Sequence, residues 1–482
     1  AAIGKAFGGR MPKSGIPPWP FHLANLLVHC TNAILVMLIL RRAAGIWPAL
    51  AGAAIFAVHP IQVEAVAWAT GMKDLLSSAL GLGAILTYLR SAEAFRDGDA
   101  GKGHRNYSAT LLLCFLGTLA KPGIMGLPII AAALDVAFIS GLRKSVLWRF
   151  IGLTATVLPS AYWTRNIQHI DGYHDNLHWS FRPLIACHAI GFYICKIFYP
   201  TGFAVDYGVR PINVALSHAS IPVASISAAI LLLPLRLRKH RAICFIAIII
   251  FLAGVFPVLG LVPFGFQFYS TVADRYVYVS MMAISLAAAL CVVRLKPRFA
   301  MVAVGLLVAC LALQSFRYAT MWRSTVTVMV QCARVNPNST VAYNNMAAAV
   351  SKVANLSIKT RESSETPVAP AWAIPTAVAD EILNLSEAMY YHQLSISTRY
   401  PVALRNLIFL AGARGRYGEA AELGELAHRC YWHDQWLPPP SIVGEYEMAW
   451  LYTELGNVER AWYWMALHLY RNRSLDEGTR TL

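Results

Sequence analysis

A short polar segment interrupts the apolar pattern at "AVHPIQVEAVAWATGMKDLLSSALG", residues 57–81. It carries a base, an acid and a cation, namely His59, Glu64 and Lys73, in the joint between two apolar runs. Charges at membrane depth cost about 2.5–3.5 kcal/mol each, and less at the membrane surface. One interpretation is a solvated interfacial turn in which Trp68 contacts the headgroups. The other is a site where Glu64 and His59 handle protons or sugar hydroxyls and Lys73 binds an anion.

Composition indicates that this is a membrane protein. Hydrophobic residues make up 57% of the 482 residues and charged residues 14%, whereas soluble domains carry about 25% charged residues. The formal net charge is +16, but the basic residues cluster at the ends of apolar segments. That distribution is typical of membrane topology and excludes nucleic acid as the expected partner. The nine cysteines form no CxxC pair, so neither a disulfide framework nor a zinc site is expected.

Apolar runs predict an all-α, polytopic membrane domain over residues 21–316, oriented by basic clusters on the cytoplasmic side. The ten predicted spans are 21–40, 45–58, 75–90, 107–121, 123–140, 145–163, 217–235, 241–262, 275–293 and 299–316. The run 183–200 breaks the alternation of basic clusters, so we expect it to lie in the outer interface as an amphipathic helix. The segments 59–74, 164–216 and 263–274 and everything after 317 are then outside.

The pattern changes at about residue 317, after which no membrane-length run occurs. "GRYGEA" (415–420) and "GNVERA" (456–461) each place a glycine turn after one apolar helix and an alanine in the next. This pattern favours tetratricopeptide-like repeats over 317–482, with a generic array of helical hairpins as the alternative. The proline-rich residues 356–375 are predicted to form an inserted loop.

Cations on the predicted outer side contradict the usual charge bias. They lie at five membrane boundaries: Lys73, Lys121, Arg182, Lys196 and Arg275. Together they could line a cavity for the phosphate of a lipid carrier, since lysine and arginine bind phosphate through charge-assisted hydrogen bonds. The alternative is intramolecular pairing of Lys73 with Asp74 and of Arg275 with Asp274.

Histidines and aspartates also gather in "HIDGYHDNLHW", residues 169–179. His174 and His178 would share a helix face, and imidazole and carboxylate suit divalent metals. We expect a hydrated loop and no metal, because no closed ligand set can be identified from the sequence. Asp135, near the cytoplasmic end of a span, is predicted to be a structural polar residue.

Five blocks of sequence, taken in order, resemble a known family. They are "FHLANLLVHCTNAILVMLILRR" (21–42), "HPIQVEAVAWATGMKD" (59–74), "LAKPGIMGLP" (119–128), "FYICKIFYP" (192–200) and "ADRYVYVSMM" (273–282). With the repeat-like tail, they are similar to the transmembrane and tetratricopeptide O-mannosyltransferases (TMTC type) of the GT-C glycosyltransferases. The resemblance implies a GT-C-like core, with active site and repeats on the lumenal or periplasmic side. It also implies sugar transfer from a polyprenyl-phosphate carrier to protein hydroxyls.

The chain departs from the family pattern in three places. Gln62 stands where the family has a second histidine, and Met72 stands where it has an arginine. The family's acidic catalytic motif lies in a first outer loop, where an acid would activate the acceptor hydroxyl. Residues 1–20, predicted to be the remnant of that loop, contain no acid. Two explanations follow: the sequence lacks its natural N-terminus, or the protein is a non-catalytic relative.

The resemblance and the residues together predict a glycosyltransferase that moves a mannose-like sugar to protein hydroxyls. The carrier phosphate would be held by Lys73, Lys121 and Arg275. The sugar and acceptor site would be shaped by His59, Glu64 and Asp274, while the catalytic residue itself stays unknown. No cofactor is expected beyond the lipid-linked sugar donor, which is a substrate.

The alternative is a catalytically inactive scaffold or accessory subunit of a larger membrane complex. The repeats would then dock a partner through a tryptophan-rich face that includes Trp450, Trp462 and Trp464. In the enzyme interpretation the same repeats present the acceptor polypeptide. A transporter is disfavoured because no inverted repeat is visible. The expected location is the bacterial inner membrane rather than the endoplasmic reticulum, with the repeats on the periplasmic or lumenal side.

Overall fold

The computed structural model describes residues 18–167, 177–236, 241–362, 376–396, 401–434, 448 and 452–465. All regular structure in these ranges is helical, which confirms the predicted all-α class. The chain divides into two units, with the boundary in the main chain after Arg323. The first unit holds the apolar helices and the second holds the repeat-like tail, and each is described by itself.

The first unit begins with a hairpin of α2 (Trp19–Ala44) and α3 (Ile46–Val58). The turn is made by Gly45, whose φ of 80° lies in the region that favours glycine, and basic Arg41 and Arg42 end α2. Helix α3 packs closely on α13 (Met281–Val292) at Gly52, where a Cβ would lie 2.4 Å from the Ser285 carbonyl oxygen. A glycine is therefore required at this crossing.

The polar segment after α3 folds as a series of short helices rather than an open loop. They are η1 (Pro60–Gln62), α4 (Val63–Ala67) and η2 (Ala69–Gly71), and the chain bends by 51° between α3 and 60–67. Pro60 has no N–H to continue the α3 ladder, which explains the break. The His59 side chain accepts the hydrogen bond of the Ile61 N–H and so starts η1. The segment thus turns the chain back and presents Glu64 on α4.

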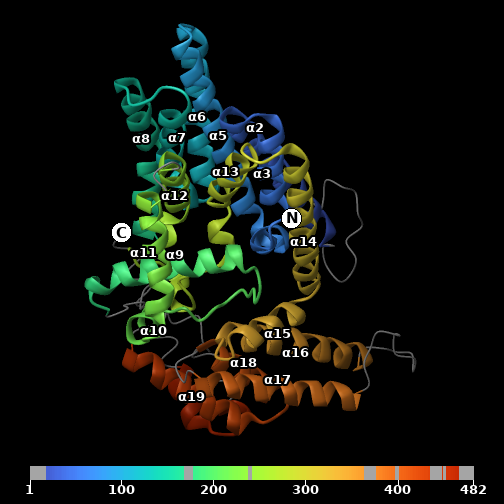
Figure 1. Cartoon of the computed structure of the whole chain (residues 1–482). Helices are drawn as coiled ribbons and strands as arrows, with labels where there is room; N and C mark the ends of the chain where they lie inside the picture. Colours follow the sequence, from blue (N-terminus) through green and yellow to red (C-terminus); the bar gives the residue numbers. More distant parts are fainter. Residues whose placement is uncertain are drawn as a thin grey trace, which may run out of the picture. The chain divides into compact units, whose positions relative to one another are not determined.

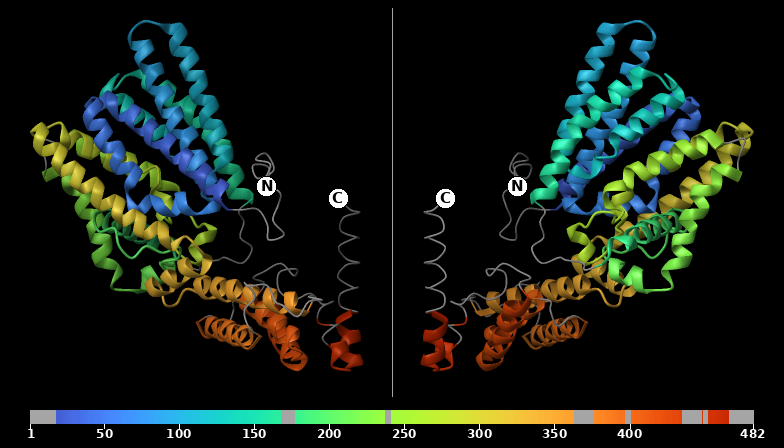
Figure 2. Two further views of the ribbon diagram at one scale, coloured as in Figure 1. Left: turned by 90° about the vertical axis from the view of Figure 1, so that its right-hand side faces the viewer. Right: turned by 90° about the vertical axis from the view of Figure 1, so that its left-hand side faces the viewer.

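Helices α5 (Met72–Arg96) and α6 (Ala100–Ala120) form the next hairpin, which projects past the neighbouring helices (Figures 1 and 2). Asp99 caps α6 by accepting from the Lys102 N–H at 2.9 Å. An ion pair of 2.7 Å between Arg42 and Glu93 ties α2 to α5. The hairpin carries Asp74 at the start of α5 and ends at Lys121.

The remaining helices of this unit complete the bundle. They are η3 (Pro122–Ile124), α7 (Leu127–Phe138), α8 (Lys144–Ile167), η4 (Trp179–Phe181), α9 (Arg182–Phe198), α10 (Pro211–Leu216), α11 (Ser220–Arg236), α12 (Arg241–Val255), η6 (Phe256–Val258), η7 (Gly265–Phe268), η8 (Asp274–Val277) and α14 (Pro297–Met321). Asp135 on α7 is fully buried and pairs with Arg149 of α8 at 2.6 Å. Its role is therefore structural, as its position in the sequence indicates.

Fewer helices than the ten predicted spans are long and apolar enough to cross a membrane. In the described ranges there are five, or six if the bent pair α3 and 60–67 counts as one: Trp19–Ala44, Ala69–Arg96, Trp179–Phe198, Arg241–Val258 and Pro297–Met321. The predicted spans at 123–140, 217–235 and 275–293 correspond to shorter apolar helices. These long apolar helices make the chain an integral membrane protein, and the apolar side chains along α14 are largely exposed, as lipid contact requires.

Helix α9 together with η4, Trp179–Phe198, is long and apolar enough to cross a membrane, although the sequence pattern places 183–200 in the interface. Figure 1 shows α9 lying crosswise to α12 and α14. It crosses α11 closely at Gly191, where a Cβ would lie 1.9 Å from the Val223 carbonyl oxygen. The interfacial position of 183–200 stays a prediction.

The second unit is built from helices. They are α15 (Thr325–Val335), α16 (Thr340–Glu362), α17 (Thr376–Ile396), α18 (Pro401–Ala413) and α19 (Tyr417–Asp434), followed by helical residues at 452–454 and 458–465. The turns at Gly415 and Gly456 have φ values of 72° and 69°, so glycine occupies both turns that the sequence singled out. Helix α16 continues to Glu362, so residues 356–362 are helical where the sequence predicts a loop.

Candidate functional site

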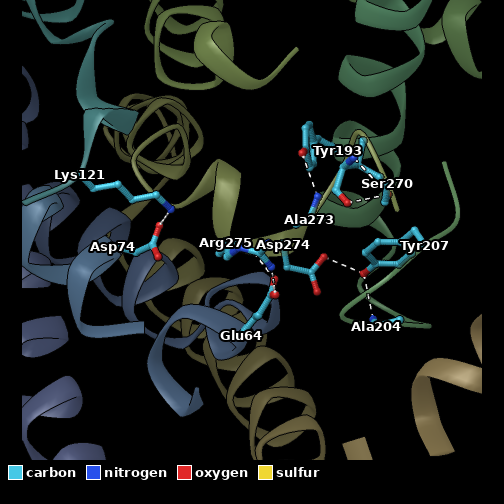
Figure 3. A network of polar contacts seen from close by, with 11 residues as sticks. Glu64, Asp74, Lys121, Tyr193, Ala204, Tyr207, Ser270, Ala273, Asp274 and Arg275 are labelled. Atoms are coloured by element: carbon cyan, nitrogen blue, oxygen red, sulfur yellow. Dashed lines mark hydrogen bonds and ion pairs between the residues drawn. The ribbon is translucent and has the colours of Figure 1, made fainter. Parts of the chain in front are cut away.

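Charged side chains from distant segments meet in the first unit (Figure 3). Glu64 comes from α4, Asp74 from the first turn of α5, Lys121 from the end of α6, and Arg275 from η8. The chain before η8 is fixed by hydrogen bonds from the Ala273 N–H to the Tyr193 hydroxyl (3.2 Å) and from the Ser270 hydroxyl to the Val272 carbonyl (2.8 Å). These bonds position Asp274 and Arg275 at the centre of the group.

Glu64 and Arg275 form a two-point buried ion pair. One Glu64 carboxylate oxygen accepts from the Arg275 backbone N–H at 2.9 Å, and the other accepts from its guanidinium Nη1. Glu64 is fully buried, and the Arg275 side chain is 8% exposed. The guanidinium also lies 4.6 Å from the Phe266 ring centroid and 5.3 Å from that of Trp68. The pair locks the 59–71 segment to η8, and both carboxylate oxygens of Glu64 are engaged.

Lys121 pairs with Asp74, and its ammonium lies 5.9 Å from the Tyr276 ring centroid. It also experiences the like charges of Arg275 and Lys73, so the three predicted phosphate ligands lie near one another. Lys73 is exposed and makes no ion pair or hydrogen bond with the part of the chain that the structure describes. The intramolecular pairing considered from the sequence therefore occurs, but with partners other than the sequence neighbours.

Asp274 differs from the other carboxylates of the site. It is fully buried, and its Oδ1 accepts a 2.7 Å hydrogen bond from the Tyr207 hydroxyl. Its Oδ2 is buried with no hydrogen-bond partner among the described residues. Such a group costs about 1–3 kcal/mol. Burial and the nearby Glu64 charge raise the pKa of Asp274 well above its ordinary value, which favours the protonated carboxyl.

His59 has both ring nitrogens engaged. Its Nε2 donates to the Ile197 carbonyl at 3.1 Å, and its Nδ1 accepts from the Ile61 N–H at 3.2 Å. This pattern defines a neutral imidazole that joins η1 to the end of α9. Gln62, at the position of the family's second histidine, donates to the Tyr278 carbonyl at 3.4 Å. Both side chains thus hold the polar segment in place.

The other two cations of the predicted outer side, Lys196 and Arg182, have partners outside the group of Lys73, Lys121 and Arg275. Lys196 donates to the Thr201 and Gly202 carbonyls at 2.7 and 2.8 Å, and its ammonium lies 5.0 Å from the Tyr207 ring centroid. Arg182 is buried and donates to the Gly260 carbonyl at 3.3 Å. Tyr207 was not predicted from the sequence, because it lies in an irregular segment with no periodic signal.

The histidine-rich segment lies mostly outside the described residues. Of its members His178 is described, and its Nδ1 is 2.9 Å from the Ser180 hydroxyl. His169, Asp171, His174 and Asp175 fall outside the described ranges. Within those ranges no group of three or more His, Cys, Asp or Glu side chains is arranged to hold a metal ion.

The three tryptophans predicted to dock a partner have different environments. Trp462 is 69% exposed, whereas Trp464 is 4% exposed and packs in the interior of the second unit with Met448 and Tyr452. Trp464 is therefore a core residue, and its assignment to a docking face is corrected: its indole faces the neighbouring helices of its own unit. Trp450 lies outside the described residues.

Comparison with known proteins gives partial matches to one family. No protein-family model matches the chain. It is 38% identical over 123 residues to the protein O-mannosyl-transferase Tmtc2 of Drosophila melanogaster, covering 25% of this chain and 13% of that protein. It is 34% identical over 150 residues to TMTC2 of Mus musculus, covering 31% and 14%. For TMTC1 of Homo sapiens the identity is 35% over 111 residues, covering 22% and 12%.

A solved structure also matches at low similarity. It is that of ArnT from Cupriavidus metallidurans bound to undecaprenyl phosphate, with 14% identity, a TM-score of 0.30 and coverage of 85% of this chain and 66% of that one. The matched segments span 12–14% of the three O-mannosyltransferases named above. Over those segments the comparisons confirm the resemblance of this chain to the TMTC-type protein O-mannosyltransferases.

Proposed function

We propose that this protein is a membrane glycosyltransferase that moves a sugar from a polyprenyl-phosphate carrier to protein hydroxyls. The observation that carries the proposal is a group of cations from three separate segments, in which Lys121 experiences the charges of both Lys73 and Arg275. Lysine and arginine are the side chains that bind phosphate by charge-assisted hydrogen bonds. The partial similarity to protein O-mannosyl-transferases supports the same class of reaction.

The charge balance of the group suits a phosphodiester. Its three cations face two paired carboxylates, those of Glu64 and Asp74, which leaves one positive charge. A sugar joined to a polyprenyl phosphate is a diester with one negative charge. The exposed Lys73 can approach such a phosphate without losing a partner, and Arg275 retains further guanidinium N–H groups because Glu64 takes only Nη1.

In the transfer itself, the acceptor hydroxyl oxygen forms a bond to the sugar C1 while the bond from C1 to the phosphate oxygen breaks. The carrier phosphate leaves with the electron pair, and the hydroxyl proton passes to a base. The cations would stabilise the charge that develops on the leaving phosphate. Neither Glu64 nor His59 offers a free atom for the proton, so their contribution is to position Arg275 and the polar segment.

The finer features of the prediction belong to this proposal. They are the GT-C-like membrane domain at 21–316 and the tetratricopeptide-like domain at 317–482 on the periplasmic or lumenal side. The mannose-like sugar, the bacterial inner membrane and the acceptor polypeptide bound by the repeats are also proposed. Each follows from the family resemblance or from the charge pattern.

One observation favours the alternative of an inactive scaffold or accessory subunit. Lys121 and Arg275 already have carboxylate partners, so two of the three cations are stable without any ligand. In a scaffold these pairs would simply hold the bundle together. Lys73 distinguishes the two interpretations, because a scaffold gives its exposed ammonium no ligand to bind.

Lys73→Gln provides the test. The purified full chain in detergent would be titrated with undecaprenyl-phosphate mannose, and Lys102→Gln, at an exposed lysine in the first turn of α6, would serve as the control. Loss of a hydrogen bond to a charged group costs about 1.5–3 kcal/mol, so we expect Lys73→Gln to bind the carrier at least about tenfold more weakly. The control variant should keep the affinity of the wild type. Equal affinity in the wild type and both variants, or no binding by the wild type, would support the scaffold.

A further inference from the structure

An irregular segment, residues 199–210 between α9 and α10, covers Asp274. Tyr207 from this segment donates its hydroxyl to Asp274 Oδ1 at 2.7 Å and accepts from the Ala204 N–H at 3.2 Å. Gly202 and Gly208 lie on either side of Tyr207, with φ values of 61° and 65°. The segment thus places the Tyr207 hydroxyl directly against the buried Asp274 carboxyl (Figure 3).

The free oxygen of Asp274 points to a ligand. Of the three side chains predicted to shape the sugar and acceptor site, His59 has both nitrogens engaged and Glu64 both oxygens. Asp274 keeps Oδ2 without a partner among the described residues, although the residue is fully buried. Buried polar atoms nearly always have a partner, so an orphaned one marks a place where a partner binds.

The position of Asp274 indicates which partner. Asp274 directly precedes Arg275, one of the proposed phosphate ligands, and Glu64 contacts Arg275 and acts electrostatically on Asp274. In a sugar phosphodiester the sugar is bonded to a phosphate oxygen. Arg275 acts electrostatically on the Asp274 carboxyl, so the sugar bonded to a phosphate held at Arg275 lies within reach of that carboxyl.

We propose that Asp274 is a sugar-binding residue whose Oδ2 makes a hydrogen bond to a hydroxyl of the carrier-linked sugar. Tyr207 is its positioning residue, because it fixes Oδ1 and so directs Oδ2, and the 199–210 segment moves aside to admit the sugar. This inference rests on the proposed function. It extends that function by assigning the sugar, as distinct from the phosphate, to particular atoms.

The charges around Asp274 define the hydrogen bond that it makes. Glu64 faces it from α4, Lys196 from α9, Tyr207 from the covering segment, and Arg275 is its neighbour in η8. Burial and Glu64 favour the protonated carboxyl, which donates from Oδ2 while Oδ1 accepts from Tyr207. Asparagine reproduces that pattern, since its amide donates and its carbonyl accepts. Leucine has a similar shape and does neither.

Two ligands and four variants test the proposal. The purified full chain would be titrated with undecaprenyl-phosphate mannose and with undecaprenyl phosphate, which lacks the sugar. We expect Asp274→Leu to weaken binding of the mannose-loaded carrier about tenfold and to leave the bare carrier within about twofold. Asp274→Asn should retain the affinity of the wild type for the loaded carrier. Tyr207→Phe should weaken loaded-carrier binding alone, whereas Tyr199→Phe, exposed in the same segment, should change neither.

The outcomes separate this inference from the proposed function. Binding of neither ligand by the wild type refutes both. Binding of both ligands by the wild type, with Asp274→Leu weakening the two equally or not at all, refutes the sugar site and leaves the phosphate site standing. If Asp274→Leu does not fold, Tyr207→Phe decides: equal effects on the two ligands, or no effect, overturn the proposal.

Discussion

Replacement of Glu64 by glutamine should destabilise the first unit strongly. The fully buried Glu64 balances an Arg275 side chain that is 8% exposed. Removing one member of a buried pair leaves an uncompensated charge and costs about 3–5 kcal/mol. The aromatic rings of Phe266 and Trp68, 4.6 and 5.3 Å from the guanidinium, would offset part of this loss, since each cation–π contact contributes about 0.5–2 kcal/mol. We therefore expect a net loss of about 2–4 kcal/mol for Glu64→Gln.

The measurement is denaturant unfolding of the purified protein in mild detergent, followed by tryptophan fluorescence. Asp97→Asn is the control, because Asp97 belongs to an exposed ion pair with Arg96 at 3.0 Å and should lose less than about 1 kcal/mol. Arg275→Met and the double variant complete a mutant cycle, in which the double variant should be more stable than the sum of the single losses implies. A Glu64→Gln protein as stable as the Asp97→Asn protein would refute the buried-pair argument.

Three further predictions follow from the geometry. The pKa of Asp274 is raised in the folded state, so between its ordinary and its raised pKa the native state binds more protons than the unfolded chain. Stability should therefore fall as pH rises through that interval. Asp274→Asn should remove this fall in a thermal midpoint measured against pH. If 183–200 lies in the interface, cysteine reporters at His178 and Arg210, in a background without other cysteines, should label from the same outer side, and opposite-side labelling would exclude the predicted topology. Trp464→Ala should destabilise the second unit by about 3–5 kcal/mol, whereas Trp462→Ser should instead reduce association with a partner or membrane in crosslinking.

Apolar runs predicted most of the helices, because a membrane helix needs apolar side chains both where it contacts lipid and where it packs against other helices. They failed where a polar contact overrides composition. The predicted span 275–293 is apolar almost from its start, yet α13 begins at Met281. The residues before it form η8, where Arg275 turns toward Glu64. Hydropathy cannot detect this break, because the partner lies 211 residues earlier in the chain.

The members of the charged group could be predicted from the sequence, but their pairing could not. Lys73 and Asp74 are neighbours in sequence, and neighbouring side chains on a helix diverge by about 100°. Asp74 therefore reaches Lys121 across the α5–α6 hairpin, and Lys73 is left exposed. The role of Tyr207 is invisible in the sequence for a different reason. Its contact with Asp274 depends on the path of an irregular segment, which carries no periodic signal.

The paired and unpaired cations of the site have different physical roles. Glu64 holds Arg275 by both its backbone and its side chain, so the position of the guanidinium is fixed before any ligand arrives. Such preorganisation lowers the cost of binding an anion, because little ordering remains to be done. The same pairing cancels most of the attraction that the cation offers. The net charge for a phosphate must then come from Lys73, whose exposed ammonium makes no ion pair within the described ranges. Fixed geometry from the buried pair and free charge from the exposed lysine together make an anion site, and neither suffices alone.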